Sequence, residues 1–189
     1  MELKLMKLKR NRPADAGANV MANVIDIFLQ PGEYFVGDAS YRIRTLLGSC
    51  VSITLWHPTL QIGAMSHFLL GSRGSSSEAE AELDPRYGDD VMYLMLQELE
   101  RSKVPPAECQ AKIFGGANMF PEQVRSEAVT VGSKNGEIAR SLLQSHRIPV
   151  VSESLFGVGH RQILFDIKSG DVWSRQIAPA LVEPAKNDT

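Results

Sequence analysis

The sequence predicts an α+β fold: a mixed α/β layered sandwich in a single domain, with a largely antiparallel or mixed sheet and two main helices. The chain has 189 residues, a length typical of one domain. Apolar residues make up 43% of it and charged residues 22%, which is ordinary for a globular protein. Segments with strand and helix patterns follow in the order strands, helix, strand, helix, strands, which favours layered packing.

The two ends of the chain are predicted to be flexible tails. Residues 1–19 are basic and then small and polar, without the apolar periodicity of a folded element. We expect the folded domain over residues 20–180 and a second flexible tail over residues 181–189.

The first part of the domain is predicted to consist of strands. Apolar runs bounded by turn signals are typical of strands, and Pro31-Gly32, Gly37-Asp38 and Pro58-Thr59 supply such turns. The expected strands lie at 22–30, as one or two strands within 34–47, at 51–56 and at 61–70.

The remaining sequence is predicted to contain both helices and the last strands. Residues 71–90 are rich in Ser, Gly and Glu, and they predict a loop that is either a mobile flap or an insertion. One helix is expected at 89–104 with Asp89 or Asp90 as its N-cap, and another at 133–148, capped by Asn135. Further strands are expected within 111–120 and at 149–156, 161–167 and 171–177.

A hairpin predicted at residues 50–67 brings a cysteine and a histidine together. If 50–57 and 60–67 pair as antiparallel strands about Pro58-Thr59, the numbers of opposite residues sum to 117, and Cys50 lies opposite His67. Side chains in such a pair lie on one face of the sheet, with Cβ atoms about 4.5–5.5 Å apart. The register therefore predicts that the thiol and the imidazole are within reach of each other.

This pairing is typical of nucleophilic catalysis by cysteine. A free thiol is only slightly ionised at neutral pH, and a neighbouring imidazole can take its proton. Gly48 and Ser49 supply backbone N–H groups which, with that of Cys50, could stabilise an oxyanion. Thr45 is the nearest candidate for a third group that orients the imidazole.

The same residues also have a purely structural interpretation. Free cysteine is among the most buried residue types, and a single match between a cysteine and a histidine often arises by chance. From the spacing alone, a structural Cys50 is slightly favoured over a catalytic one. Cys109 lies in no comparable motif and is expected to be structural.

Composition excludes several classes of protein. The formal charge of −2 gives no electrostatic reason to bind nucleic acid. No apolar stretch is long enough for membrane insertion and no secretory signal is visible, so a cytoplasmic location is expected. Two cysteines form neither a disulfide framework nor a metal cluster, and no metal or cofactor is expected.

The chain resembles the CheD family, the chemoreceptor glutamine deamidases of bacterial chemotaxis. The resemblance covers roughly residues 25–175. It is carried by a series of blocks in order, of which Gly-Ser-Cys, Gly-Ala-Met-Ser-His and Phe-Gly-Gly-Ala-Asn-Met-Phe are together the most specific: LQPGEYFVG, TLLGSCVSITLWHP, GAMSHFLL, RYGDDVMYLML, AKIFGGANMF and VGSKNGEIARSLLQSHRIPVV.

The resemblance implies an activity and a site. Residues 20–180 would be a catalytic domain, a hydrolase that converts glutamine side chains of methyl-accepting chemotaxis receptors to glutamate and releases ammonia. Cys50 would be the nucleophile and His67 the general base and acid. The family has a threonine one position upstream of Thr45, where this chain has Arg44, and Thr45 is the residue carried over.

Two glycine-rich blocks bear on the substrate groove. Gly115, Gly116 and Asn118 could line it, because glycines allow a close approach to the backbone; a tight turn after a buried strand is the alternative. In SESLFGVGHR the chain departs from the family, since Phe156 and His160 stand where glycines are expected.

Three functions remain open in this interpretation. The leading one is the receptor deamidase, because a purely binding protein would not need a thiol near an imidazole. The second is a non-catalytic chemotaxis adaptor that binds receptors or a CheC-type phosphatase, which is also a possible partner of the enzyme. The third keeps Cys50 as nucleophile but transfers the glutamine acyl group to an amine in place of water.

Overall fold

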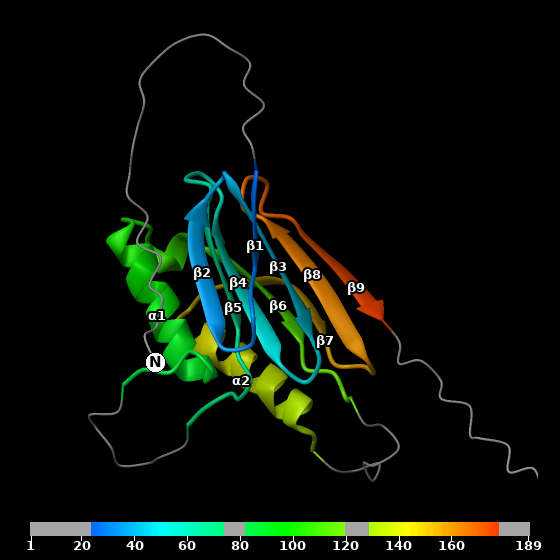
Figure 1. Cartoon of the computed structure of the whole chain (residues 1–189). Coiled ribbons are helices and arrows are strands. Elements are labelled where there is room, and N and C mark those ends of the chain that lie inside the picture. The colour runs from blue at the N-terminus through cyan, green and yellow to red at the C-terminus, as the bar shows by residue number, and fades with distance from the viewer. Residues whose placement is uncertain (1–23, 74–81, 120–128, 178–189) are drawn as a thin grey trace, which may run out of the picture.

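The computed structural model describes residues 24–73, 82–119 and 129–177. These residues form nine strands, two α-helices and one short 3-10 helix (η1, Pro106–Glu108). The strands make two mixed sheets, and both helices pack on the five-stranded one (Figure 1). The predicted single-domain α+β fold is confirmed, whereas the tails predicted at 1–19 and 181–189 lie outside the described residues.

The five-stranded sheet forms the middle layer. Its strand order is β2-β5-β4-β6-β7, antiparallel except for the parallel pair of β6 and β7. The strands are β2 (Glu33–Asp38), β5 (Ile62–His67), β4 (Val51–His57), β6 (Gln110–Gly115) and β7 (Val150–Leu155).

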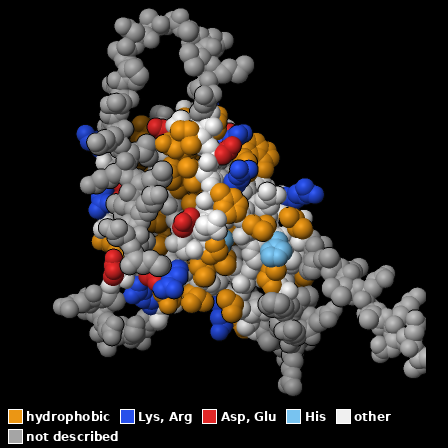
Figure 2. Space-filling model, viewed as in Figure 1, with side chains coloured by type: hydrophobic (Ala, Val, Ile, Leu, Met, Phe, Trp, Pro, Cys, Tyr) orange, Lys and Arg blue, Asp and Glu red, His pale blue; other side chains and the backbone are white. Residues whose placement is uncertain are grey.

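The four-stranded sheet forms an outer layer. Its order is β1-β3-β8-β9, with β1 and β3 parallel and the other pairs antiparallel. The strands are β1 (Ile25–Phe28), β3 (Tyr41–Leu47), β8 (His160–Asp166) and β9 (Val172–Ile177). Large apolar side chains such as Phe28 and Trp173 are exposed on these strands, and Figure 2 shows hydrophobic side chains between charged ones on this side of the molecule.

Two buried clusters hold the layers together. One lies between the helices and the five-stranded sheet and includes Ile53, Phe68 and Met95. The other lies between the two sheets and includes Met65 and Phe165. Because the five-stranded sheet is covered on both faces, nearly every residue of β4 and β5 is buried, polar ones included.

The chain passes from one sheet to the other at two tight connections. After β2 it turns at residues 39–40 into β3, and the Ser40 N–H donates to the Asp38 carboxylate at 3.0 Å. After β3 it returns to the five-stranded sheet through residues 48–50 into β4. Cys50 therefore lies where the backbone changes layers.

The hairpin register differs from the predicted one. Thr54 pairs with Met65 and His57 with Ile62, so opposite residues sum to 119 and the predicted sum of 117 is wrong by two. The connection has four residues, 58–61. It is closed by a hydrogen bond of 2.9 Å from the Gln61 N–H to the His57 carbonyl. A shift of two residues leaves every side chain on its predicted face. Cys50 and His67 are thus diagonal neighbours and not directly opposite.

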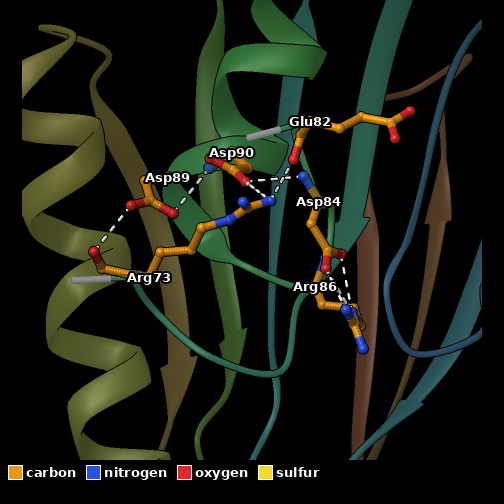
Figure 3. Close-up of polar contacts among 7 residues, drawn as sticks. Arg73, Glu82, Asp84, Arg86, Asp89 and Asp90 are labelled. Carbon is orange, nitrogen blue, oxygen red and sulfur yellow. Dashed lines mark hydrogen bonds and ion pairs between the residues drawn. The ribbon is translucent and has the colours of Figure 1, made fainter. Parts of the chain in front are cut away.

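The first helix, α1 (Gly88–Arg101), begins one residue before its predicted cap. Tyr87 is the N-cap and uses no side-chain hydrogen bond, so the assignment of Asp89 or Asp90 was wrong. Both aspartates lie in the first turn, where negative charge favours the helix dipole. Asp89 accepts from Ser72, and Asp90 accepts from the Asp84 N–H at 2.9 Å and from Arg73 (Figure 3).

The segment predicted as a loop at 71–90 is described at both ends. The N–H groups of Leu69 and Leu70 both donate to the Arg86 carbonyl, and Leu70 forms an isolated bridge with Tyr87. Residues 82–90 are therefore tied to the strand end beyond β5, contrary to the prediction for that part. Residues 74–81 of the predicted flap lie outside the described residues.

The second helix, α2 (Val131–Ser145), also begins earlier than predicted. Its N-cap is Thr130, whose hydroxyl accepts from the Ser133 N–H at 3.1 Å, so Asn135 is not the cap. Asn135 instead lies inside the helix and is 2% exposed. Within the described part of the chain, no helix is both long and apolar enough to cross a membrane.

Candidate active site

Cys50 lies between β3 and β4, with fixed backbone on both sides. Its carbonyl accepts from the Gly116 N–H at 2.8 Å. The next residue, Val51, exchanges two backbone hydrogen bonds with Phe68, at 3.1 and 3.0 Å. The half-buried side chain of Cys50 packs against the cluster between the sheets, on the face where His67 also lies.

His67 is bound to Thr45 across the gap between the sheets. The Thr45 hydroxyl oxygen lies 2.8 Å from His67 Nδ1 and 2.7 Å from the Leu29 carbonyl oxygen, and both side chains are buried. Arg44, the position at which the family resemblance expects the threonine, is exposed. Alternation along β3 turns Thr45 inward with Ile43 and Leu47, so Thr45 is the residue that the structure brings to His67.

This contact determines which nitrogen of His67 carries the proton. The Leu29 carbonyl can only accept, so the single hydroxyl proton of Thr45 is donated to it. Thr45 must then accept from His67, and Nδ1 is the protonated nitrogen of the neutral ring. Nε2 keeps its lone pair, which is the form that a general base needs.

Burial favours the neutral forms of both groups. Desolvation raises the pKa of the Cys50 thiol, opposed by the backbone N–H of Cys50 itself. Desolvation lowers the pKa of His67 to about 4, opposed by the hydrogen-bonded backbone at Leu29. Both shifts favour a neutral thiol and a neutral imidazole at neutral pH over a thiolate and an imidazolium.

The loop before β4 has backbone donors that are available to a ligand. In the described part of the chain, the N–H groups of Ser49 and Cys50 have no hydrogen-bond acceptor in another residue. The Gly48 carbonyl accepts from the Ala117 N–H at 2.9 Å, which fixes the start of the loop. Stabilisation of an oxyanion by these donors stays a prediction.

The glycines of the FGGANMF block bring two loops against Cys50. Gly115 has φ +111°, and a Cβ there would lie 2.2 Å from the Cys50 carbonyl oxygen. Gly116 has φ +66°, and its Cβ would lie 2.6 Å from the Gly132 carbonyl oxygen. The Asn118 N–H donates to Gly157 at 2.8 Å. These contacts fit a tight turn after a buried strand; a role for these three residues in substrate binding stays a prediction.

Two buried polar residues near this loop were not predicted as part of the site. Asn135 donates to the carbonyls of Ser49 and Leu69, and Arg161 donates to those of Gly115 and Phe156. A signal was present for each in the sequence. Asn135 shares a buried helix stripe with Ala139 and Leu143, and Arg161 stands at an inward position of β8.

Phe156 shows the cost of the departure from the family pattern. It has φ +65°, a backbone conformation that glycine adopts freely and that a bulky residue rarely adopts. The Phe156 ring packs against Gly136, where an added Cβ would lie 2.6 Å from the ring. The Arg140 guanidinium lies 5.3 Å from the ring centroid. These contacts offset the strain of the backbone.

Comparisons with known proteins show the family of this chain. A family model described as CheD chemotactic sensory transduction matches residues 69–176. A protein of Albidiferax ferrireducens is 65% identical over 155 residues, which cover 82% of this chain and 89% of the relative. The chain belongs to the CheD family.

Other CheD proteins are similar over most of their length. One from Chromobacterium violaceum is 42% identical over 84% of this chain and 81% of its own. One from Dechloromonas aromatica is 43% identical over 78% of this chain and 85% of its own. All three relatives are named "Probable chemoreceptor glutamine deamidase". The 155 matched residues are 82% of this chain, so the region similar to the Albidiferax protein spans positions 50 and 67.

Among the residues that the structure describes, no group of three or more His, Cys, Asp or Glu side chains is placed to hold a metal ion. The groups available at the site are a thiol, an imidazole, a hydroxyl and backbone amides.

Proposed function

We propose that this CheD protein is a chemoreceptor glutamine deamidase, a hydrolase that converts glutamine side chains of methyl-accepting receptors to glutamate. The names of its relatives support the activity and the substrate. The observation that carries the proposal for this chain is the contact of His67 Nδ1 with Thr45 at 2.8 Å, because it leaves Nε2 as a base on the face shared with Cys50.

The acylation step needs only groups of this site. Cys50 sulfur attacks the carboxamide carbon while His67 Nε2 takes the thiol proton. The N–H groups of Ser49 and Cys50 bind the oxyanion. The carbon–nitrogen bond then breaks, and the proton on Nε2 goes to the departing amine, which leaves as ammonia.

The second half of the reaction restores the enzyme. His67 Nε2 takes a proton from water, and the oxygen attacks the thioester carbon. The carbon–sulfur bond breaks, and Nε2 returns the proton to sulfur. The glutamine side chain has become a carboxylic acid, with water consumed and ammonia released, and its proton passes to ammonia in solution to leave glutamate and ammonium. Because its substrate would be the cytoplasmic part of a receptor, we place the enzyme in the cytoplasm.

A receptor fragment tests the proposal directly. The full chain is incubated with the cytoplasmic fragment of a methyl-accepting receptor, and its peptides are compared by mass spectrometry with those of a fragment incubated alone. Conversion of particular glutamines to glutamates supports the deamidase. Stable binding without conversion, to several receptors or to a CheC-type phosphatase, would support the adaptor. An arm with a small primary amine distinguishes transglutamination, because the amine would then appear on the glutamine.

The pH dependence should reveal the buried histidine. With the pKa of His67 lowered to about 4, the base stays neutral at pH 5, so we expect kcat/KM to change by less than about twofold between pH 7 and pH 5. With an ordinary histidine of pKa near 6.5, the rate would fall by about 25-fold over that range. Initial rates of ammonia release measure the profile, with circular dichroism as the check for folding. An acid limb with a midpoint between pH 6 and 7 would contradict the prediction.

The hydroxyl group of Thr45 should matter more for activity and stability than the shape of the side chain. Thr45→Val removes both the acceptor for His67 Nδ1 and the donor to Leu29, so we expect kcat to fall by about 10- to 100-fold and stability by about 1–3 kcal/mol. Thr45→Ser keeps the hydroxyl and serves as the matched control. Steady-state kinetics and urea unfolding measure both effects; equal rates for the two variants would argue against this role.

A further inference from the structure

One side chain of α2 holds the two chain segments that carry the thiol and the imidazole. Asn135 Nδ2 donates to the Ser49 carbonyl at 3.1 Å and to the Leu69 carbonyl at 2.7 Å. Ser49 directly precedes Cys50, and Leu69 follows His67 by two residues. Asn135 is 2% exposed, and it reaches both carbonyls because α2 begins at Val131 and places residue 135 on the buried face.

The contact with Ser49 fixes the direction of the Cys50 N–H. The Ser49 carbonyl and the Cys50 N–H belong to one planar trans peptide, so they point in opposite directions. Asn135 draws the carbonyl toward α2, which directs the N–H away from the helix. The same N–H counteracts the effect of burial on the thiol pKa.

The next peptide is held as well. The Cys50 carbonyl accepts from the Gly116 N–H at 2.8 Å, and the Val51 N–H donates to Phe68 at 3.1 Å. Both peptides at Cys50 are thus held by hydrogen bonds, the first by a side chain and the second by backbone. A hydrogen bond to the Ser49 carbonyl also polarises the peptide and makes the Cys50 N–H a stronger donor.

We propose that Asn135 is a positioning residue for deamidation, which fixes the peptide between Ser49 and Cys50 so that the Cys50 N–H is ready to bind the oxyanion. Through Leu69 it also sets the distance between the loop that carries Cys50 and the strand that carries His67. The inference rests on the proposed function. Asn135 does not touch the reacting atoms, so its effect belongs to kcat and not to substrate binding.

Removal of the amide should separate kcat from KM. We expect Asn135→Ala to lower kcat by about 10- to 100-fold, because the Cys50 N–H is no longer held in place, while KM changes by less than about threefold. The thiol should also react more slowly with iodoacetamide at pH 8, since its thiolate loses a fixed donor. Peptide mass spectrometry separates the reaction of Cys50 from that of Cys109, whose pKa is raised to about 11 by burial.

An isosteric variant gives a signature that simple loss of stability would not produce. In Asn135→Asp the carboxyl group donates one hydrogen bond when protonated and none when ionised. Burial between two carbonyls raises its pKa, so kcat of this variant should recover as the pH falls from 8 toward 5. His67, with its pKa lowered to about 4, stays neutral over that range and does not mask the recovery.

Ala139→Gly is the matched control. Ala139 lies one turn further along the same buried stripe, and glycine there weakens the helix by about 1 kcal/mol without touching Ser49 or Leu69. We expect its kcat to stay within about twofold of wild type when rates are corrected for the folded fraction. The inference is overturned if Ala139→Gly loses as much kcat as Asn135→Ala, or if Asn135→Ala keeps wild-type kcat and alkylation.

The alkylation rate distinguishes this inference from the proposed function, because it needs no receptor. Slower alkylation of Cys50 in Asn135→Ala, with a wild type that deamidates nothing, would support the positioning and refute the deamidase. Unchanged alkylation and kcat in the variant of an active enzyme would refute the positioning alone.

Discussion

Cys50→Ala is expected to reduce the deamidation of receptor glutamines by about 10⁴-fold or more, because the reaction then has no nucleophile. The fold should persist. The Cys50 side chain is only half buried, and the hydrogen bonds of the residue are made by its backbone. Ammonia release and peptide mass spectrometry measure the rate, and urea unfolding measures the stability.

Cys50→Ser is a stricter test of the same prediction. Serine keeps the size of the side chain, but a hydroxyl is far less acidic than a thiol, and His67 with its pKa lowered to about 4 is a weak base. We expect a loss of about 10³-fold or more, which a merely structural Cys50 would not show.

Cys109→Ala is the matched control for both variants of Cys50. Cys109 is 1% exposed and belongs to the cluster beneath α1, so its replacement should lower stability and leave kcat unchanged. The catalytic interpretation would be wrong if Cys50→Ala retained a tenth of wild-type activity, or if Cys109→Ala were the inactive variant.

Gly115→Ala should produce the largest loss of stability among single glycine substitutions at the site. At φ +111° a side chain is strained, and the new Cβ would lie 2.2 Å from the Cys50 carbonyl oxygen and 3.1 Å from Val51 Cα. Both contacts are with backbone, which cannot rotate away. We expect a decrease of about 2–4 kcal/mol in the free energy of unfolding. Deamidation should fall as well, since the clash displaces the Cys50 peptide.

Gly157→Ala separates the effect of backbone strain from the effect of the clash with backbone atoms. It shares a positive φ, +83°, but the nearest atom to its Cβ would be in the flexible Gln176 side chain, at 3.3 Å. Strain alone should cost about 1–2 kcal/mol. Urea unfolding compares the variants, and an equal loss in both would mean that the backbone contact at Cys50 contributes nothing.

The sequence contains enough to predict the elements and their faces. Alternation in β4 and β5 places Cys50 and His67 on one side, and the helical stripes of α1 and α2 are apolar where they pack. It does not contain enough to predict the register. A shift of two residues preserves every face, so the alternation is the same for sums of 117 and 119.

The division into two sheets could not be predicted from the sequence, for a similar reason. A short turn predicts that two strands follow one another, and it does not tell whether they pair or separate into layers. Gly37-Asp38 resembles a hairpin turn, yet both residues belong to β2. The turn at residues 39–40 connects strands of different sheets, and so does the connection at residues 48–50. Thr45 could therefore be named only as the nearest candidate. Its contact with His67 depends on the packing of one sheet against the other.

The passage of the chain between layers has a consequence for the chemistry. Thr45 is on the four-stranded sheet and His67 on the five-stranded one, so the orientation of the base depends on how two separate platforms sit against each other. Bulky replacements deep in that seam, at Phe165 or Ile43, would push the platforms apart and slow the reaction without any change at the sulfur. The rate of turnover in this protein therefore also reports on the packing between its two sheets.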